Sequence, residues 1–295
     1  MFDRTDVIYS YDGSFNGLMC CVFTGYVSHE IPSDVVAGEP EQLSLNPIKH
    51  IETLPEQYER ILKSIPIKMG ENALDFIQKA FLTCHPHKDK LILEFMYLAY
   101  TYGSNTFNML TSNVVSQLNK AVLHCSREAH LLRGFIRFSD SGGALSAVIE
   151  PKNCVIPLIA GHFIDRYRNE DFLIYDKTHR MALIYADKNA QIINDVTFEL
   201  PDATDEETYY QNLWKTFYDS IGIKERFNPR CRMNLMPKRY WGNMVEVRDE
   251  VNKPQNAPRP SGLSSLGKRT SDALQYENTA NENFTLLINN AHPQK

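Results

Sequence analysis

The 295-residue chain lacks most of the signatures that identify a compartment. Its six cysteines show neither the spacing of a disulfide framework nor a Cys-x-x-Cys pair. No apolar run approaches the roughly 18 residues of a membrane span. The N-terminal sequence MFDRTDVIYSYDG has neither the basic start nor the apolar core of a signal peptide. These absences predict a reduced, cytoplasmic protein that has no membrane segment.

Motifs that indicate a cofactor or a reaction are also missing. There is no G-x-S-x-G nucleophile elbow and no glycine-rich dinucleotide fingerprint. The turn Asp12-Gly13-Ser14 lacks the Gly-Lys-Ser/Thr ending of a phosphate loop, so it predicts a helix capped by Ser14. The stretch Cys84-His85-Pro86-His87 gathers potential ligands without the second half of a four-ligand zinc site. We therefore predict no metal and no cofactor.

The composition divides the chain into a globular part and a polar end. Hydrophobic residues make up 43% of the sequence, which is enough for a sizeable core. Residues 252–295 are instead dominated by Pro, Ser, Asn and Gly, a composition that predicts a disordered tail. Residues 1–251 are predicted to form a single globular domain, in which residues 55–132 could form a helical subdomain.

Hydrophobic periodicity predicts an α+β fold. The first half is expected to be mainly helical, apart from a strand near residues 7–11 and a loop-like stretch over residues 31–53. The second half is expected to hold a mixed, mostly antiparallel sheet with helices, the last of which opens at a Thr204–Glu207 capping box. The predicted helices are 15–26, 55–64, 70–83, 88–102, 113–132 and 157–167. The predicted strands of the second half are 134–139, 144–150, 172–176, 181–186 and 191–198.

One segment stands out against a formal net charge of −5. Residues 226–241, RFNPRCRMNLMPKRYW, carry five cations and no acid. Arginine's planar fork suits phosphate, and exposed aromatic rings can stack on bases. Alternatively, Arg226 and Arg239 pair with the acids of residues 202–207, and Trp241 plugs the core. The candidate nucleic-acid contacts in this segment are Arg226, Arg230, Arg239, Tyr240 and Trp241.

Two further stretches combine cations with histidine. The sequence SREAHLLRGFIRFS of residues 126–139 places three arginines around a histidine. In residues 162–168, HFIDRYR, a histidine, an aspartate and an arginine lie one helical turn apart. The candidate nucleic-acid contacts here are Arg127, Arg133, Arg137 and Arg166.

The second of these stretches also offers a candidate catalytic pair. His162 and Asp165 could act as acid and base, because a carboxylate can fix the tautomer of an imidazole. The alternative is a surface ion pair of Asp165 with Arg166 or Arg168, beside a structural histidine.

Four motifs, in order, resemble one bacterial family. They are YDGSFNGLMCCVF, EAHLLRGFIRFSD, PLIAGHFIDRY with FLIYDKTHR, and LWKTFYDSIGIKERFNPRCRMNLMPKRYW. The family is assigned to DNA metabolism or DNA repair, and its exact activity is unknown. The resemblance implies a radical-SAM protein as partner and, in some relatives, fusion to a uracil-DNA glycosylase-like domain. This chain has no such second domain and no cluster-binding cysteine triad, so any iron–sulfur chemistry would belong to the partner.

Three hypotheses follow for function. The first is an accessory protein that binds DNA, single- or double-stranded, and presents it to a repair enzyme. The second is an enzyme that acts on DNA through His162 and Asp165. The third is an interaction protein that does not bind nucleic acid and whose arginines are structural. They differ in where the arginines lie: in one cleft with His162 and Asp165, on an open basic face, or buried against acids.

Overall fold

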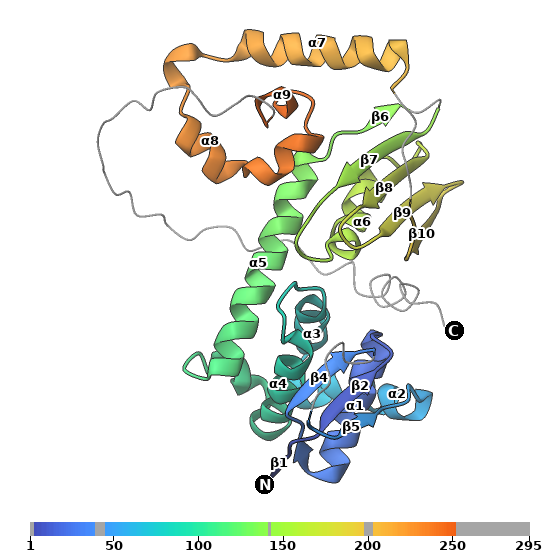
Figure 1. Cartoon of the computed structure of the whole chain (residues 1–295), viewed down its shortest axis with the longest axis vertical. Coiled ribbons are helices and arrows are strands. Elements are labelled where there is room, and N and C mark those ends of the chain that lie inside the picture. The colour runs from blue at the N-terminus through green and yellow to red at the C-terminus, as the bar shows by residue number, and fades with distance from the viewer. Residues whose placement is uncertain (1–2, 39–44, 141–142, 198–202, 252–295) are drawn as a thin grey trace.

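The computed structural model describes residues 3–38, 45–140, 143–197 and 203–251. The protein is α+β, as predicted, with helices and small parallel sheets in the first half and a larger mixed sheet in the second (Figure 1). The predicted disordered tail over residues 252–295 lies outside the described residues.

The first half contains short parallel strands, of which only the one near residues 7–11 was predicted. β2 (Ile8–Tyr11) lies at the centre of a three-stranded sheet, between β4 (Asp34–Ala37) and β5 (Ile48–His50), and pairs in parallel with both. β1 (Asp3–Arg4) pairs in parallel with β3 (Glu30–Ile31). The loop predicted for residues 31–53 is therefore wrong in part. Strands of three or four residues carry little periodicity, and their parallel partners lie too far away in sequence for a turn signal to reveal them.

Helices cover this sheet and form most of the first core. The rings of Tyr9 and Tyr11 from β2 are buried in it, together with Phe95 of α4 and Leu18 of α1. α1 begins where expected, because the Ser14 side chain accepts a hydrogen bond from the backbone N–H of Gly17 (2.8 Å). The helices are α1 (Phe15–Ser28), α2 (Pro55–Met69), α3 (Ala73–Phe81), α4 (Lys88–Tyr102), the 3₁₀ helix η1 (Gly103–Asn108) and α5 (Asn113–Phe135).

The second half holds a sheet of five described strands in the order β10-β9-β8-β7-β6. β7 and β8 pair in parallel, and the chain between them forms the helix α6 (Ile156–Arg166). The other three pairings are antiparallel. The expected mostly antiparallel sheet is thus confirmed, but the strand predicted for residues 134–139 is shorter, because α5 continues to Phe135. The strands are β6 (Ser139–Asp140), β7 (Leu145–Ile149), β8 (Phe172–Asp176), β9 (Met181–Ala186) and β10 (Asn189–Ile193).

The long helix α5 connects the two halves (Figure 1). Val115, Leu118 and Cys125 near its start belong to the first core, whereas Ala129 and Leu132 near its end belong to the second. One helix therefore fixes where the candidate arginines on its last turns lie relative to both cores.

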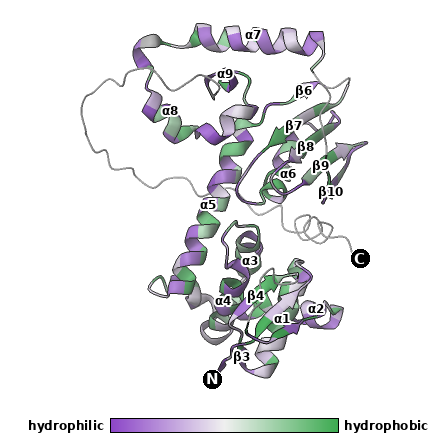
Figure 2. Cartoon of the chain, in the orientation of Figure 1, coloured by the Kyte–Doolittle hydropathy of each residue, from purple (hydrophilic) through white to green (hydrophobic). Residues whose placement is uncertain are grey.

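After the sheet, residues 205–251 form a series of helices. The predicted cap of α7 forms, because the Thr204 hydroxyl accepts from the backbone N–H of Glu207 (3.1 Å). Figure 2 shows both polar and apolar residues along this helix. Leu213, Phe217 and Ile221 remain exposed. None of the helices in the described part combines the length and the hydropathy of a membrane span. The elements are α7 (Asp205–Ile221), η2 (Lys224–Arg226), α8 (Pro229–Leu235), η3 (Lys238–Asn243) and α9 (Arg248–Val251).

Candidate nucleic-acid interface

Three of the predicted residues lie together on the exposed side of α5 and α6. Arg133, on the last turns of α5, donates a hydrogen bond to the carbonyl oxygen of Leu158 in α6 (2.9 Å). His162 follows Leu158 by one turn of α6, and Arg166 follows His162 by another. Arg133 and Arg166 are exposed, and neither forms an ion pair with a described acid. We call these three residues the α5–α6 basic face.

The charges of this face affect the pKa of His162. Partial burial lowers the pKa of His162, and the positive charges of Arg133 and Arg166 lower it further. The effect of Asp165 is opposite and smaller. At neutral pH the imidazole is therefore uncharged and lies between two cations. An anion that bound here would neutralise both arginines and favour the protonated imidazole.

Asp165 lies one turn from His162, as the sequence predicts, but it faces water. Its side chain is 82% exposed, and its nearest cationic partner is Arg168, at 3.9 Å. Within the described residues no hydrogen bond joins Asp165 to His162. The acid–base role of this pair stays a prediction, and in this structure the carboxylate does not orient the imidazole.

Arg137 has a different environment from Arg133, although it lies only four residues further on, just past the end of α5. Its Nη2 lies 2.6 Å from Oε1 of Glu246, whose side chain is only 3% exposed. Trp214 of α7 donates to the other oxygen of the same carboxylate (3.3 Å). Burial alone would raise the pKa of Glu246, but the hydrogen bonds from Arg137 and its neighbours outweigh burial and lower it. Arg137 therefore neutralises a buried acid and ties α7 to the rest of the protein.

Arg239, in the cationic end segment of residues 226–241, also pairs with a buried glutamate. Its Nη2 lies 2.9 Å from Oε1 of Glu128, whose side chain is 1% exposed on α5. The hydroxyl of Tyr240 donates to the same oxygen (2.8 Å), and the backbone N–H of Asn153 donates to the other (2.8 Å). Burial would raise the pKa of Glu128, but these hydrogen bonds and that of the Lys152 N–H together lower it. The alternative considered for Arg239, pairing with an acid, is thus realised, but with Glu128 and not with residues 202–207.

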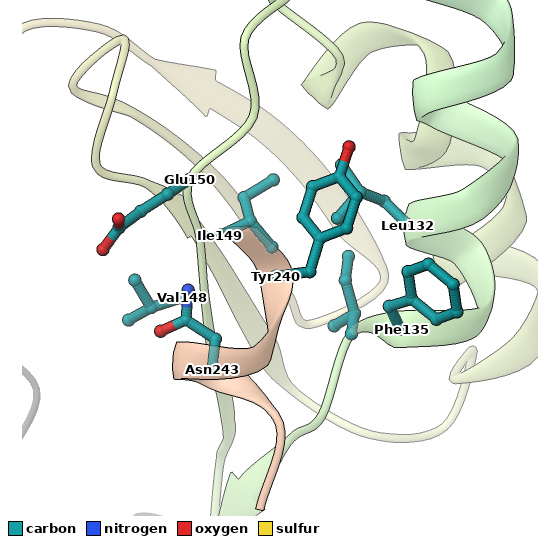
Figure 3. A pocket seen from close by; sticks show the side chains of 8 residues that line it. Leu132, Phe135, Val148, Ile149, Glu150, Tyr240 and Asn243 are labelled. Atoms are coloured by element: carbon teal, nitrogen blue, oxygen red, sulfur yellow. The ribbon is translucent and has the colours of Figure 1, made fainter. Parts of the chain in front are cut away.

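Of the three aromatic residues in residues 226–241, Phe227 is 61% exposed, whereas the two stacking candidates Tyr240 and Trp241 are packed inside. Figure 3 shows the Tyr240 ring beside Leu132 and Phe135 of α5 and Ile149 of β7. Trp241, 3% exposed like Tyr240, donates from its indole nitrogen to the carbonyl oxygen of Met236 (2.9 Å). Neither ring offers a free face on which a base could stack.

The remaining cations of the end segment fall into two groups. Arg232 pairs with Glu250 and lies with its Cζ 4.5 Å from the centre of the Trp241 ring, and the Nζ of Lys238 lies 5.6 Å from the same centre. Arg226 and Arg230 are exposed, and neither pairs with a described acid. Arg127, on α5, is also exposed, but it lies roughly a third of a turn around the helix from Arg133. These three stay candidates for phosphate contact outside the α5–α6 basic face.

An oriented histidine does occur, at a place the sequence reasoning overlooked. Nδ1 of His179 lies 2.7 Å from Oδ2 of Asp176, a fully buried carboxylate at the end of β8. The other oxygen of Asp176 accepts from the backbone N–H groups of Thr178 and His179. The sulfur of Cys154 lies close enough to Asp176 for the carboxylate to help burial raise its pKa. The signal was present in FLIYDKTHR, as an aspartate and a histidine three residues apart at a hairpin turn.

No group of three or more His, Cys, Asp and Glu side chains arranged to hold a metal ion occurs among the described residues. In particular, the backbone N–H of Cys84 donates to the side chain of Asn153, and His87 lies 3.9 Å from Asp34. The described structure is thus that of an α+β protein with a basic face on α5 and α6 and two buried glutamates, each paired with an arginine.

A family assignment accompanies this geometry. A family described as a domain of unknown function, DUF4130, matches residues 86–246, more than half of the chain. The chain belongs to this family. A search of curated proteins and a search of solved structures each found no match. The matched range includes both arginine–glutamate pairs and the α5–α6 basic face, whereas the parallel sheet of the first half precedes it.

Proposed function

We propose that the chain is an accessory protein that binds nucleic acid in DNA repair or DNA metabolism. The observation that carries the proposal is the α5–α6 basic face, where Arg133 and Arg166 flank His162 without an acid partner. Exposed, unpaired arginines bind phosphate groups through charge-assisted hydrogen bonds. The face lies on two packed helices, and its Arg133 is held in position by the hydrogen bond to Leu158.

The proposal shifts the nucleic-acid contact away from the end segment. Arg137 and Arg239 neutralise buried glutamates, and Tyr240 and Trp241 are buried, so these four residues support the structure. Arg226 and Arg230 remain exposed and could extend the contact. This division explains how an acidic protein can hold a phosphate backbone locally.

Salt-dependent binding tests the proposal. DNA affinity, measured by fluorescence anisotropy on single- and double-stranded oligonucleotides, should fall as salt increases, because each phosphate contact releases counterions. The double variant Arg133→Gln/Arg166→Gln should reduce the salt slope by about two, roughly one for each lost contact. The double variant Arg4→Gln/Lys120→Gln removes the same charge from exposed sites elsewhere and should leave the slope unchanged. Equal slopes for both double variants would show that this face does not bind phosphates.

The proposed partner is a radical-SAM protein, which the family resemblance implies. An accessory role predicts that the two proteins co-purify, or that the radical-SAM protein acts on DNA more efficiently in the presence of this chain. If the chain neither binds the partner nor changes its action on DNA, the accessory role is lost, even where DNA binding persists.

A second candidate function, an enzyme acting on DNA, is favoured by the Asp176–His179 pair. A buried carboxylate that accepts from an imidazole fixes the tautomer and leaves the other ring nitrogen free to act as a base. On this reading the acid–base pair is Asp176–His179, not His162–Asp165. Replacing His179 by Gln should then abolish turnover of a DNA substrate while DNA affinity persists, whereas His162→Gln should not. Full turnover by the folded His179→Gln variant would exclude this role.

A further inference from the structure

A cavity of about 390 Å³ opens on the first half of the molecule, away from the α5–α6 basic face. It lies between the end of α1, the length of α2 and the end of α4, in the lower part of Figure 1. Small-molecule sites in proteins typically enclose ~300–1,000 Å³, so the cavity is large enough for a small ligand. Most of its walls precede the family match at residue 86, so the site belongs to a part of the chain that the family assignment does not describe.

One wall of the cavity is aromatic. The rings of Tyr26 and Tyr100 lie with their centres 5.2 Å apart, and Tyr26 is 43% exposed. The Tyr100 hydroxyl is fixed by the hydroxyl of Ser64, at 2.6 Å. Phe23 contributes a third ring. A partly exposed tyrosine that packs against a second ring can stack on a flat aromatic ligand with little loss of side-chain freedom.

The other walls carry positive charge and no acid. Arg60 and Lys68 lie two turns apart on α2, and His29 caps the end of α1. The Cζ of Arg60 lies 5.8 Å from the centre of the Phe23 ring, which holds the guanidinium over the aromatic wall. Neither Arg60 nor Lys68 pairs with an acid in the described part of the chain, and no carboxylate lines the cavity. Unlike Lys63 on the same helix, which pairs with Glu59, these two cations are available to an external anion.

We infer that this cavity binds a nucleotide, whose base stacks on Tyr26 and whose phosphate is held by Arg60 and Lys68. Each half of the site alone would suit a simpler ligand. An apolar ligand would leave the cations without a partner, and an inorganic anion would leave the aromatic wall without a function. A phosphorylated planar ring satisfies both. The nucleotide can be free or part of a single strand, and the two sources share this chemistry.

Isothermal titration calorimetry with adenosine 5′-monophosphate, adenosine, inorganic phosphate and a short single-stranded oligoadenylate tests the inference. Adenosine monophosphate should bind, and it should bind more tightly than adenosine or phosphate, because only the nucleotide uses both walls. If the oligonucleotide binds at least tenfold more tightly than the mononucleotide, the site takes a base of a single strand. If it does not, the site takes a free nucleotide. Absence of binding by both at millimolar concentration would overturn the inference.

Variants assign the binding to this cavity. Tyr26→Leu should weaken nucleotide binding roughly 5- to 150-fold, the equivalent of the ~1–3 kcal/mol that base–aromatic stacking contributes. Arg60→Gln/Lys68→Gln should weaken it at least tenfold, whereas Lys63→Gln on the same helix should have no effect. Unchanged affinity in both Tyr26→Leu and Arg60→Gln/Lys68→Gln would place any bound nucleotide elsewhere. The Arg133→Gln/Arg166→Gln variant should bind adenosine monophosphate normally, so the outcome is independent of the α5–α6 basic face.

Discussion

Two pairs of arginines that look alike in the sequence have opposite environments in the structure. Arg137 and Arg239 each lie within 3 Å of a buried glutamate, whereas Arg133 and Arg166 face water without an acid partner. Arg133 and Arg137 are four residues apart at the end of α5, so neither their position in the chain nor the local composition separates them. What distinguishes them is whether a buried carboxylate lies opposite. An arginine-rich segment therefore identifies a binding surface only after its internal partners have been accounted for.

The comparison has an energetic meaning. Burying a carboxylate costs several kcal/mol unless a cation and further hydrogen bonds compensate for the lost water. Glu128 and Glu246 are compensated in this way, so their arginines are committed to the folded state. Arg133 and Arg166 do not compensate a buried carboxylate among the described residues, so they can bind an anion without destabilising the protein.

The largest effect expected from this comparison is at Glu128. Glu128→Ala removes the acceptor for Arg239, Tyr240 and two backbone N–H groups, and leaves a partly buried guanidinium without its partner. We expect the free energy of unfolding to fall by about 3–5 kcal/mol. Urea unfolding followed by circular dichroism measures this loss. Glu59→Ala, at an exposed glutamate of α2, should change stability by less than about 0.5 kcal/mol. A similar small loss in both variants would refute the structural role of Glu128.

The next effect separates Arg137, just past the end of α5, from Arg133 on the last turns of that helix. Arg137→Gln leaves Glu246 buried without its cation, and we expect a loss of about 1–3 kcal/mol, less than for Glu128→Ala because Glu246 keeps its hydrogen bond from Trp214. Arg133→Gln should cost no more than about 0.5 kcal/mol, since Arg133 is exposed. Urea unfolding of the two variants under identical conditions gives the comparison directly. If Arg133→Gln were the more destabilising, the proposed division between structural and binding arginines would be reversed.

The dependence of stability on pH should show that Glu128 and Glu246 are structural acids. The pKa of Glu128 and that of Glu246 are lowered in the folded state, so both groups stabilise the protein above their unfolded pKa of about 4.3. This contribution is lost as the pH falls through the lower, folded pKa values. Stability should therefore decrease below about pH 4, and the decrease should be smaller in Glu128→Gln/Glu246→Gln. Thermal melting between pH 2.5 and 7 measures it, and equal slopes in wild type and variant would contradict the assignment.

The fold was predictable where the pattern was long and local. The boundaries of α4, β8 and β9 agree with the sequence prediction residue for residue, because each has clear periodicity and a turn or cap at its ends. β4 and β5 were missed because they pair in parallel with β2, a non-local contact that short strands do not indicate. The end of α5 was placed too early, since β-branched and aromatic residues after Gly134 imitate a strand.

The candidate site was predictable in its parts but not in its partners. Arg133, His162 and Arg166 were selected from two separate stretches, and the structure brings them to one face. The acids opposite Arg137 and Arg239 could not be found, because Glu246 and Glu128 lie 109 and 111 residues away from them. Pairing at such separations depends on how α5 packs against the end segment, which no local pattern encodes.

The smallest predicted effect is a change of DNA affinity with pH, which depends on His162 in the α5–α6 basic face. The pKa of His162 is lowered by burial and by Arg133 and Arg166, so the imidazole is neutral when the face is empty. A bound phosphate reverses the sign of the local field and raises this pKa, so binding takes up a proton and DNA affinity should rise as the pH falls from 7.5 to 5.5. One extra charge within about 4 Å of a phosphate at an exposed site is worth about 1 kcal/mol, which corresponds to roughly fivefold in affinity.

Fluorescence anisotropy at constant ionic strength should show this increase for wild type and not for His162→Asn, whose amide does not titrate. If affinity rises equally in both proteins, the proton is taken up elsewhere, and the phosphate does not lie beside His162.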